Sequence, residues 1–327
     1  MTTVDSSLID ARSGLTGAAA EGRVAAMSEA DAVQRVMHQG EQSAWTTAAL
    51  SLALSAQAAG PVLASARDVL SAAGLDLDEP PAGLDPAGAA AQAAAPLFQT
   101  AEVLRGGGSW GELSDDALIA QGRASAQGAE AFLRIGLPVM PGLAEALARP
   151  GARMLDVGVG VGALAVAYAE ALPQVTVIGL DVLPRVLDIA RRTVAQSDVA
   201  DRVELREQSV GDLDDVDAFD FAWVPAPFVP PDALRAGIAA IARALRPGGW
   251  VIVGHGKFSG DPLDDALTRF KTVIFGGTVL DGAAACELLT GAGLAGAMTM
   301  PTPPGAPAVT IARRPPAAAG DASTVGR

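Results

Sequence analysis

The sequence predicts an α/β fold: a doubly wound parallel sheet in the second half of the chain, preceded by a mainly α-helical domain. After Pro150, short apolar segments alternate with helical segments, which is the pattern of a parallel sheet covered by helices. A glycine-rich turn follows the first apolar segment, as it does where a strand turns into a helix beside a ligand. Before Pro150, alanine-rich segments show helical periodicity.

The chain of 327 residues is long enough for one large or two ordinary domains. We expect a flexible N-terminus over residues 1–27 and a helical domain over 28–148. The α/β domain is expected over 149–314. Residues 315–327 consist mainly of Pro, Ala, Gly and Ser, which predicts a disordered tail.

In the helical domain, Ser28–Leu75 is expected to be helical, with Ser28 at its start. Asp76–Pro96 is rich in Pro, Gly and Ala and is expected to be a loop. The run Gly106–Gly108 marks a second break. Asp115–Leu147 is expected to be helical again, ending before Arg149-Pro150-Gly151.

The α/β domain is expected to alternate strands and helices in chain order. The expected strands are Arg153–Val157, Val175–Leu180, Val203–Arg206, Phe219–Val224 and Trp250–Val253. The expected helices between them are Val161–Leu172, Pro184–Ala195 and Asp232–Leu245.

The net charge of −14 argues against a nucleic-acid partner, because binding a polyanion normally requires a basic face. The single cysteine, Cys286, cannot form an intramolecular disulfide, which fits a reducing cytoplasm. The first ten residues lack the basic and apolar regions of a secretory signal. We therefore expect a cytoplasmic protein, and we expect no metal site.

The stretch Ser43–Ala66 has no charged residue and is long enough to span a membrane. It consists largely of Ala, Ser, Thr and Gln, and Gly60-Pro61 interrupts it. Such residues partition weakly into lipid, so we interpret the stretch as a buried or dimer-forming helix pair and expect a homodimer without membrane contact.

The strand that ends at Val157 leads into three glycines, Gly158, Gly160 and Gly162. Glycines permit a sharp turn and a close approach of the backbone to a ligand. The same residues satisfy the dinucleotide pattern G-x-G-x-x-G/A. Asp181 ends the second strand and would bind a ribose in either NAD or S-adenosylmethionine (SAM), so this carboxylate does not separate the two cofactors.

Three further features favour SAM. Asp156 lies inside the first strand, where a dinucleotide site usually has an apolar residue. The run from Asp217 to Trp223 has an F-D-x-x-x form, and Leu245-Arg246-Pro247-Gly248-Gly249-Trp250 is a turn into a strand. In this order, residues from about 149 to 313 resemble the Rossmann-like domain of class I SAM-dependent methyltransferases. The alternative is an NAD(P)-binding oxidoreductase.

The resemblance implies a set of cofactor-binding residues. Gly158, Gly160 and Gly162 would line the methionine and ribose, Asp156 would support that loop, and Asp181 would take the ribose hydroxyls. The full expected set is Asp156, Gly158, Gly160, Gly162, Asp181, Val182, Gln208, Ser209, Val210 and Pro225. Ser209 stands where family members often have Asp facing the adenine. Asp212 either replaces that acid or belongs to a solvated acidic loop.

The helices before Pro150 resemble those of small-molecule O-methyltransferases, which carry an N-terminal helical dimerisation domain that also covers the substrate. This resemblance implies a small-molecule acceptor, or a small peptide carboxylate, in secondary metabolism. A winged helix is not recognisable in the front domain. The other interpretation is a SAM-fold protein without methyl transfer, acting as a scaffold or rearrangement catalyst.

The segment Val224–Pro230 has no histidine to act as a base, and Pro225 replaces the Asn or Asp of the N/D-P-P-Y/F motif. We therefore favour methylation on oxygen over nitrogen. His255 follows the fifth strand and is the candidate base or substrate contact; it is equally interpretable as a loop histidine without a role. Lys257 would pair with an anionic substrate, and His38 is expected at the surface or an interface.

Overall fold

The computed structural model describes residues 29–316, apart from 56–57, 78, 80, 82–83, 107–108 and 303–306. The expected flexible N-terminus and residues 317–327 of the expected tail lie outside the described residues. Residues 1–43 and 44–327 are separate compact units, so each is described by itself.

The expected helix Ser28–Leu75 is two helices. Helix α1 covers Glu29–Leu54, and α2 covers Gly60–Ala72. The break follows from Gly60, whose φ of +58° is left-handed, and from Pro61 in the first turn of α2, where a missing N–H costs nothing. The helix pair expected for Ser43–Ala66, with its interruption at Gly60-Pro61, is present.

Helix α3, Pro86–Leu104, corrects the expected loop Asp76–Pro96. The Asp85 carboxylate caps it by accepting hydrogen bonds from the amides of Ala87 and Gly88, at 3.1 and 3.0 Å. The alanines that follow have the highest helix propensity, and they outweigh the glycine and proline content of the segment.

The expected helix Asp115–Leu147 is helical but interrupted. Helix α4 covers Asp115–Ala131, a π-helical turn covers Phe132–Gly136, and α5 covers Leu143–Leu147. The interruption contains Pro138 and Pro141, which lack the amide donor that a continuous helix requires.

The described strands form one seven-stranded sheet in the order β3-β2-β1-β4-β5-β7-β6. The strands are β1 Ala152–Val157, β2 Val175–Asp181, β3 Val203–Glu207, β4 Phe219–Pro225, β5 Leu245–His255, β6 Ala295–Met300 and β7 Ala308–Arg313. The neighbours from β3 to β5 are parallel, and the strand order reverses between β1 and β4. In such sheets, ligands bind at this reversal, beyond the carboxyl ends of the strands.

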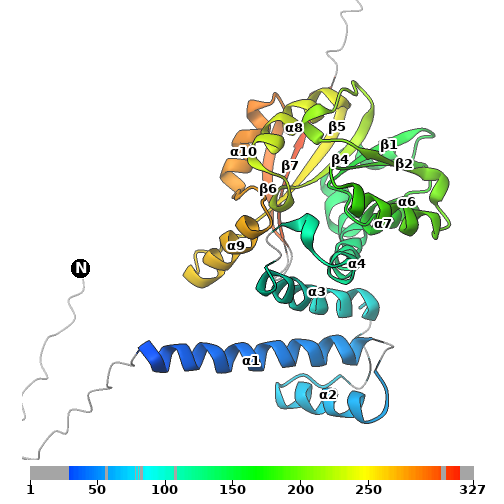
Figure 1. The fold of residues 1–327 in the computed structure, drawn as a ribbon. Coiled ribbons are helices and arrows are strands. Elements are labelled where there is room, and N and C mark those ends of the chain that lie inside the picture. The colour runs from blue at the N-terminus through cyan, green and yellow to red at the C-terminus, as the bar shows by residue number, and fades with distance from the viewer. Residues whose placement is uncertain are drawn as a thin grey trace, which may run out of the picture. The chain divides into compact units, whose positions relative to one another are not determined.

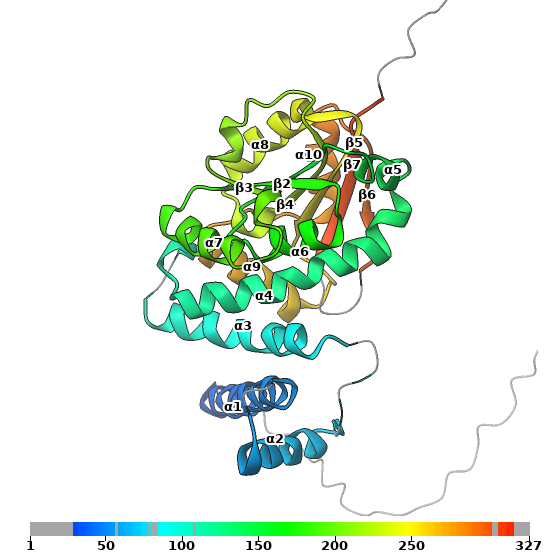
Figure 2. The same cartoon turned by 90° about the vertical axis from the view of Figure 1, so that its right-hand side faces the viewer.

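The doubly wound sheet is confirmed for β1 to β5, and one edge that the sequence did not predict is antiparallel, because β7 pairs antiparallel with β5 and with β6. The sheet is therefore mixed. The helices of this domain are α6 Ala163–Ala171, α7 Pro184–Ala195, α8 Pro231–Ala244, α9 Pro262–Ile274 and α10 Gly282–Gly291. Helices α6 and α7 cover one face of the sheet, and α8 and α10 cover the other (Figures 1 and 2).

Each face of the sheet has its own apolar core. On the α8 face, Leu234, Ile238 and Ile241 are buried, as the helical spacing predicts. On the α6 face, the rings of Phe132 and Phe221 stack with centroids 4.6 Å apart. Burial on both faces fixes the strands rigidly, and the loops at their carboxyl ends are positioned by that scaffold.

Candidate active site

The turn between β1 and α6 is built by left-handed glycines. Gly158, Gly160 and Gly162 have φ values of +63°, +57° and +81°, which a residue with a Cβ rarely adopts. A Cβ on Gly158 or Gly160 would meet only ordinary contacts, at 3.7 and 3.9 Å, and Gly158 is exposed, so packing does not require either glycine. A Cβ on Gly162 would lie 3.3 Å from Ala190 of α7, so this glycine serves helix packing instead.

Asp181, the last residue of β2, is held against this turn. Its carboxylate accepts hydrogen bonds from the amides of Gly160 and Leu183, both at 3.0 Å. Burial raises the pKa of Asp181, and these backbone hydrogen bonds oppose the rise by favouring the charged form. Each carboxylate oxygen has a second lone pair, so the group can still accept hydrogen bonds from a ligand.

Asp156 of β1 lies beneath the turn and is 1% exposed. Its Oδ2 atom has no hydrogen-bond partner among the described residues. Burial, reinforced by the negative charge of Asp181, raises the pKa of Asp156 to about 7. A buried acceptor without a donor is unfavourable, and a cationic or N–H group entering the turn would relieve it.

The residues after β3 are placed at the same edge of the sheet. The backbone amide of Gln208 donates to the backbone oxygen of Asp181 at 3.0 Å. The Ser209 hydroxyl caps the short helix Val210–Asp212 by accepting a hydrogen bond from the Gly211 amide. The Val210 side chain is buried against Gly237 of α8. Val182, after Asp181, is 59% exposed.

Pro225 ends β4 beside the turn, and its ring lies 3.7 Å from the Cβ position of Gly158. The structure therefore brings Asp156, Asp181, Pro225 and the glycines to one place, the carboxyl edge of β1, β2 and β4. Asp212 lies outside this group, in the short helix Val210–Asp212 that Ser209 caps.

His255 ends β5 but is turned into the sheet, at 2% exposure. Its Nδ1 atom lies 2.9 Å from the Gly256 carbonyl, which can only accept, so Nδ1 carries the proton. Its Nε2 atom then accepts from the Thr310 hydroxyl at 2.9 Å. Burial lowers the pKa of His255. Both ring nitrogens are occupied, so this arrangement offers no base to a substrate.

The structure also describes the two other candidate side chains. Lys257 donates to the Thr302 carbonyl at 3.2 Å, and His38 is exposed on α1.

Three aromatic rings that the sequence interpretation missed converge beside the turn; we call Trp110, Phe228 and Phe275 the aromatic wall. The Trp110 ring lies 4.7 Å from that of Phe228 and 5.5 Å from that of Phe275, between centroids. Phe228 follows β4, and Phe275 follows α9. The one available signal was Trp110, two residues after the glycine run Gly106–Gly108, since loop residues disproportionately serve binding.

The aromatic wall borders the cofactor edge. Trp110, Phe275 and Leu183 pack against the same cluster of buried residues, which includes Val161 of the glycine turn. Arg185 of α7 fixes the segment after Trp110 by donating to the carbonyls of Gly111 and Leu113 and by pairing with Asp115. The front helical segment therefore reaches the edge at which β1 and β2 end.

A family model described as "Methyltransferase domain" matches residues 154–249, the segment from β1 through the glycine turn and Asp181 to the turn that contains Gly248. The chain contains a class I SAM-dependent methyltransferase domain. The match begins inside β1 and ends inside β5, so it covers the parallel part of the sheet with α6, α7 and α8.

Two curated relatives match this methyltransferase domain. Ubiquinone biosynthesis O-methyltransferase of Xanthomonas campestris is 41% identical over 110 residues, 33% of this chain and 44% of that protein. Release factor glutamine methyltransferase of Rhodopirellula baltica is 37% identical over 82 residues, 25% of this chain and 28% of that protein. The matched part of the chain spans less than half the length of either relative.

Among solved structures, human N-acetylserotonin methyltransferase in complex with SAM is similar over 89% of this chain and 99% of its own, with a TM-score of 0.57 and 16% identity. At that identity the likeness establishes the fold: a helical region followed by the class I methyltransferase domain. None of the described helices has the length and apolarity that crossing a membrane requires.

Proposed function

We propose that this protein transfers a methyl group from SAM to a small-molecule acceptor. The observation that carries the proposal is the cradle at the glycine turn, where the Asp181 carboxylate is held against Gly160 and the buried Oδ2 atom of Asp156 has no partner among the described residues. This acid-lined cradle fits a ligand that carries hydroxyl and ammonium donors, as SAM does.

SAM supplies a methyl carbon that is already activated by its sulfonium, so the protein mainly has to position the acceptor and exclude water. In this chain, Asp181 would accept from the ribose hydroxyls through its remaining lone pairs. The left-handed glycines would let the backbone approach the cofactor. Gln208, Ser209 and the backbone of Val210 would face the adenine, and Pro225 would border the reacting methyl group.

The aromatic wall supports an apolar, planar acceptor. Its three rings come from segments before, within and after the matched domain, and each is partly exposed. Aromatic faces stack on flat ligands and bury a large apolar area, which excludes water from the reacting atoms.

We favour oxygen as the accepting atom. Pro225 lacks the side-chain amide or carboxylate that would orient an amide nitrogen, and the Xanthomonas relative is an O-methyltransferase. The Rhodopirellula relative is a glutamine methyltransferase, so the relatives alone do not decide between the two atoms.

The test is release of S-adenosylhomocysteine from SAM with a panel of phenols, aromatic carboxylic acids, aliphatic alcohols and amines, followed by mass spectrometry of the product. We expect turnover with a flat aromatic oxygen acceptor. Trp110→Ala should raise KM for that acceptor at least tenfold while S-adenosylhomocysteine binding stays within twofold. A product methylated on nitrogen or carbon would overturn the choice of oxygen.

The alternative is a SAM-binding protein without methyl transfer. Such a protein would bind S-adenosylhomocysteine. It would not consume SAM with any acceptor in the panel or with a cell extract. Binding of NADH in place of S-adenosylhomocysteine would instead reject the whole proposal.

We also infer a homodimer, formed through the front helices, that acts in the cytoplasm. Within the uncharged stretch Ser43–Ala66, the apolar side chains of Trp45 and Val62 are 70% and 56% exposed in the single chain. Exposed apolar area of this kind marks an interface, and a second copy of the same helices supplies a matching apolar surface. The unpaired Cys286 is in keeping with a reducing compartment.

A further inference from the structure

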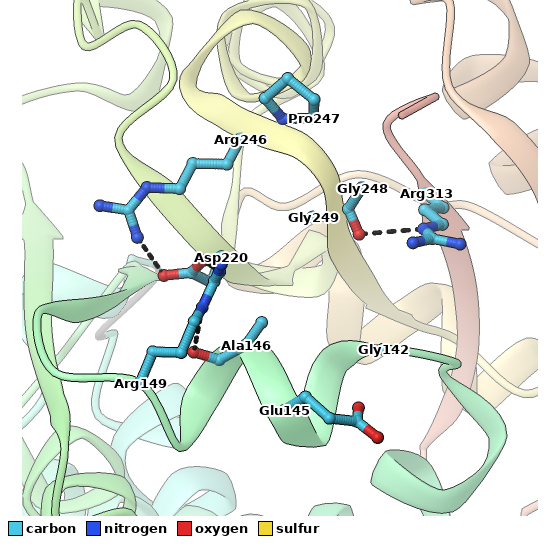
Figure 3. Close-up of a pocket in the computed structure, with 10 residues that line it drawn as sticks. All are labelled: Gly142, Glu145, Ala146, Arg149, Asp220, Arg246, Pro247, Gly248, Gly249 and Arg313. Atoms are coloured by element: carbon cyan, nitrogen blue, oxygen red, sulfur yellow. Dashed lines mark hydrogen bonds and ion pairs between the residues drawn. The ribbon is translucent and has the colours of Figure 1, made fainter. Parts of the chain in front are cut away.

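A cavity lies at the opposite edge of the sheet from the glycine turn, where β1, β4 and β5 begin. Its volume is about 220 Å³. The residues that line it are Gly142, Glu145, Ala146, Arg149, Asp220, Arg246, Pro247, Gly248, Gly249 and Arg313. They come from α5 and the residues on either side of it, and from strands β4, β5 and β7 (Figure 3).

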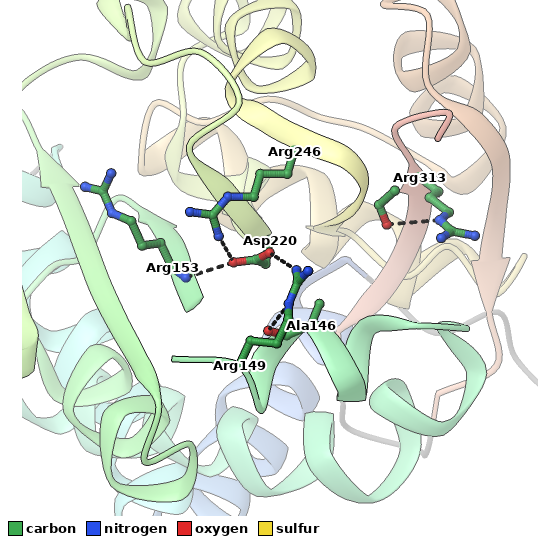
Figure 4. Close-up of polar contacts among 7 residues, drawn as sticks. Ala146, Arg149, Arg153, Asp220, Arg246 and Arg313 are labelled. Atoms are coloured by element: carbon green, nitrogen blue, oxygen red, sulfur yellow. Dashed lines mark hydrogen bonds and ion pairs between the residues drawn. The ribbon is translucent and has the colours of Figure 1, made fainter. Parts of the chain in front are cut away.

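Asp220 is the buried centre of one wall of this cavity, with its side chain 2% exposed. Arg149 donates to its Oδ1 atom at 3.1 Å, and Arg246 donates to its Oδ2 atom. The backbone amide of Arg153 also donates to Oδ2, at 3.0 Å (Figure 4). One carboxylate therefore holds two guanidinium groups, and one positive charge is left over on this wall.

Arg313 stands on the other side of the cavity (Figure 3). Its Nε atom donates to the Gly248 carbonyl at 3.0 Å, and its guanidinium carbon lies 5.6 Å from the centroid of the Trp250 ring. Among the described residues, no carboxylate forms an ion pair with Arg313. Its two terminal nitrogens therefore keep donors for a ligand.

The charges around the cavity do not cancel. Arg149, Arg246 and Arg313 contribute three positive charges, and Asp220 and Glu145 contribute two negative ones, which leaves an excess of one positive charge. This local excess occurs in a chain whose net charge is −14. A concave site with a net positive charge attracts anions, even where the whole molecule carries a net negative charge.

We propose that this cavity is a binding site for a small phosphate-type oxyanion, separate from the cofactor cradle. Guanidinium groups present paired donors that match the oxygens of phosphate, and here they face one cavity from two sides. The cavity is smaller than the roughly 300–1,000 Å³ of sites for drug-sized ligands, which fits a compact anion.

The test is calorimetric titration of the full-length protein with inorganic phosphate at constant ionic strength, with acetate as the comparison anion. We expect saturable binding of one phosphate, and weaker binding of acetate, which has fewer acceptor oxygens and a smaller charge. Arg313→Met should weaken phosphate binding at least tenfold. This variant leaves the Asp220 cluster intact, so its folding is not at risk from an unpaired buried acid.

Arg149→Met tests the other wall and should also weaken binding at least tenfold. Arg235→Met is the matched control, since it removes one exposed arginine paired with Asp232 on α8 and should leave phosphate binding unchanged. The proposal is overturned if phosphate binding does not saturate, if acetate binds equally well, or if all three variants behave alike. None of these measurements requires SAM, so their outcome is independent of the proposed methyl transfer.

Discussion

The Asp181 carboxylate accepts a hydrogen bond from the Gly160 amide at 3.0 Å, joining the end of β2 to the turn after β1. The two residues are 21 positions apart, and parallel pairing of β1 with β2 brings them together. This contact fixes the conformation of the glycine turn through the protein's own residues. Because the turn is already ordered, ligand binding loses less conformational entropy than it would with a flexible loop.

Removing the Asp181 carboxylate should therefore weaken cofactor binding in two ways, through lost ligand contacts and through a looser turn. We expect micromolar binding of S-adenosylhomocysteine, about −8 kcal/mol. Asp181→Ala should cost on the order of 2–4 kcal/mol, measured by calorimetry. Asp188→Ala, which removes an exposed carboxylate on α7, is the control and should change the affinity by less than twofold.

The raised pKa of Asp156 predicts how stability depends on pH in the absence of cofactor. The carboxyl has a pKa of 3.8 when unfolded and about 7 when folded. Between these values the folded state holds a proton that the unfolded state has lost, so stability decreases as pH rises through this window. Asp156→Asn removes the titrating group. The free energy of unfolding of the variant, relative to that of the natural protein, should therefore increase from pH 4 to pH 7.

Urea denaturation at pH 4, 5, 6 and 7 measures this difference. Asp188→Asn provides the matched control, because its carboxylate is exposed. If the difference in free energy of unfolding between Asp156→Asn and the natural protein is the same at all four pH values, the buried carboxyl does not titrate as we expect.

His255 is predicted to act in folding and not in catalysis. His255→Ala leaves the Thr310 hydroxyl without its acceptor and should destabilise the protein by about 1–3 kcal/mol. The folded variant should keep most of its methyl-transfer rate, and the rate of the natural protein should be flat from about pH 6 to 9 if the acceptor is a carboxylate, which is ionised there.

Thr310→Val removes the same hydrogen bond from the other side and should destabilise the protein comparably. A rate that drops roughly 10²–10⁴-fold in His255→Ala but not in Thr310→Val would instead assign a general base to His255. A phenol or alcohol would then be the acceptor.

Asp220 is predicted to be required for stability. Asp220→Ala leaves Arg149 and Arg246 without their shared carboxylate, and breaking a buried ion pair typically costs about 3–5 kcal/mol. We discount this figure toward its lower end because Arg149 is 64% exposed and therefore partly screened. Asp232→Ala, which breaks an exposed pair with Arg235, should cost less than about 1 kcal/mol in the same urea titration.

The proposed dimer predicts that introducing a charge into its apolar surface lowers the molecular mass measured in solution. Trp45→Glu places a carboxylate in the stretch Ser43–Ala66 and should shift the protein from dimer to monomer in light scattering. Asp68→Lys, on α2 just beyond that stretch, also changes the surface charge and should leave the dimer intact. A natural protein that scatters as a monomer at high concentration would rule the dimer out.

The parallel part of the fold could be predicted because its signals are local. The strands from Ala152 to Val224 are short apolar runs between helices, and glycine and proline mark their ends. Helix α3 was missed because a single capping residue, Asp85, decides whether the alanines after it are helical. Strand β7 pairs with β5 across more than fifty residues, and its antiparallel direction has no signature of its own.

The meeting of Asp181 with the glycine turn could be predicted because both follow neighbouring strands of the expected sheet, whereas the aromatic wall could not. Trp110 and Phe275 are brought together by packing between segments far apart in the chain. Spacing predicts which residues share an element, but it does not predict which loops meet. The position of His255 was predicted, but its two hydrogen bonds depend on Thr310 and Gly256, whose placement only the structure gives.

Two rings of the aromatic wall, Trp110 and Phe275, lie outside residues 154–249, the segment by which the family is recognised. A classification built on that segment groups proteins by the cofactor that they bind. It contains no information from Trp110 and Phe275, which we propose contact the acceptor. During divergence, the front and rear segments can therefore exchange one acceptor for another while the recognised segment stays constant. Comparisons restricted to Trp110, Phe228 and Phe275 would group relatives by acceptor instead.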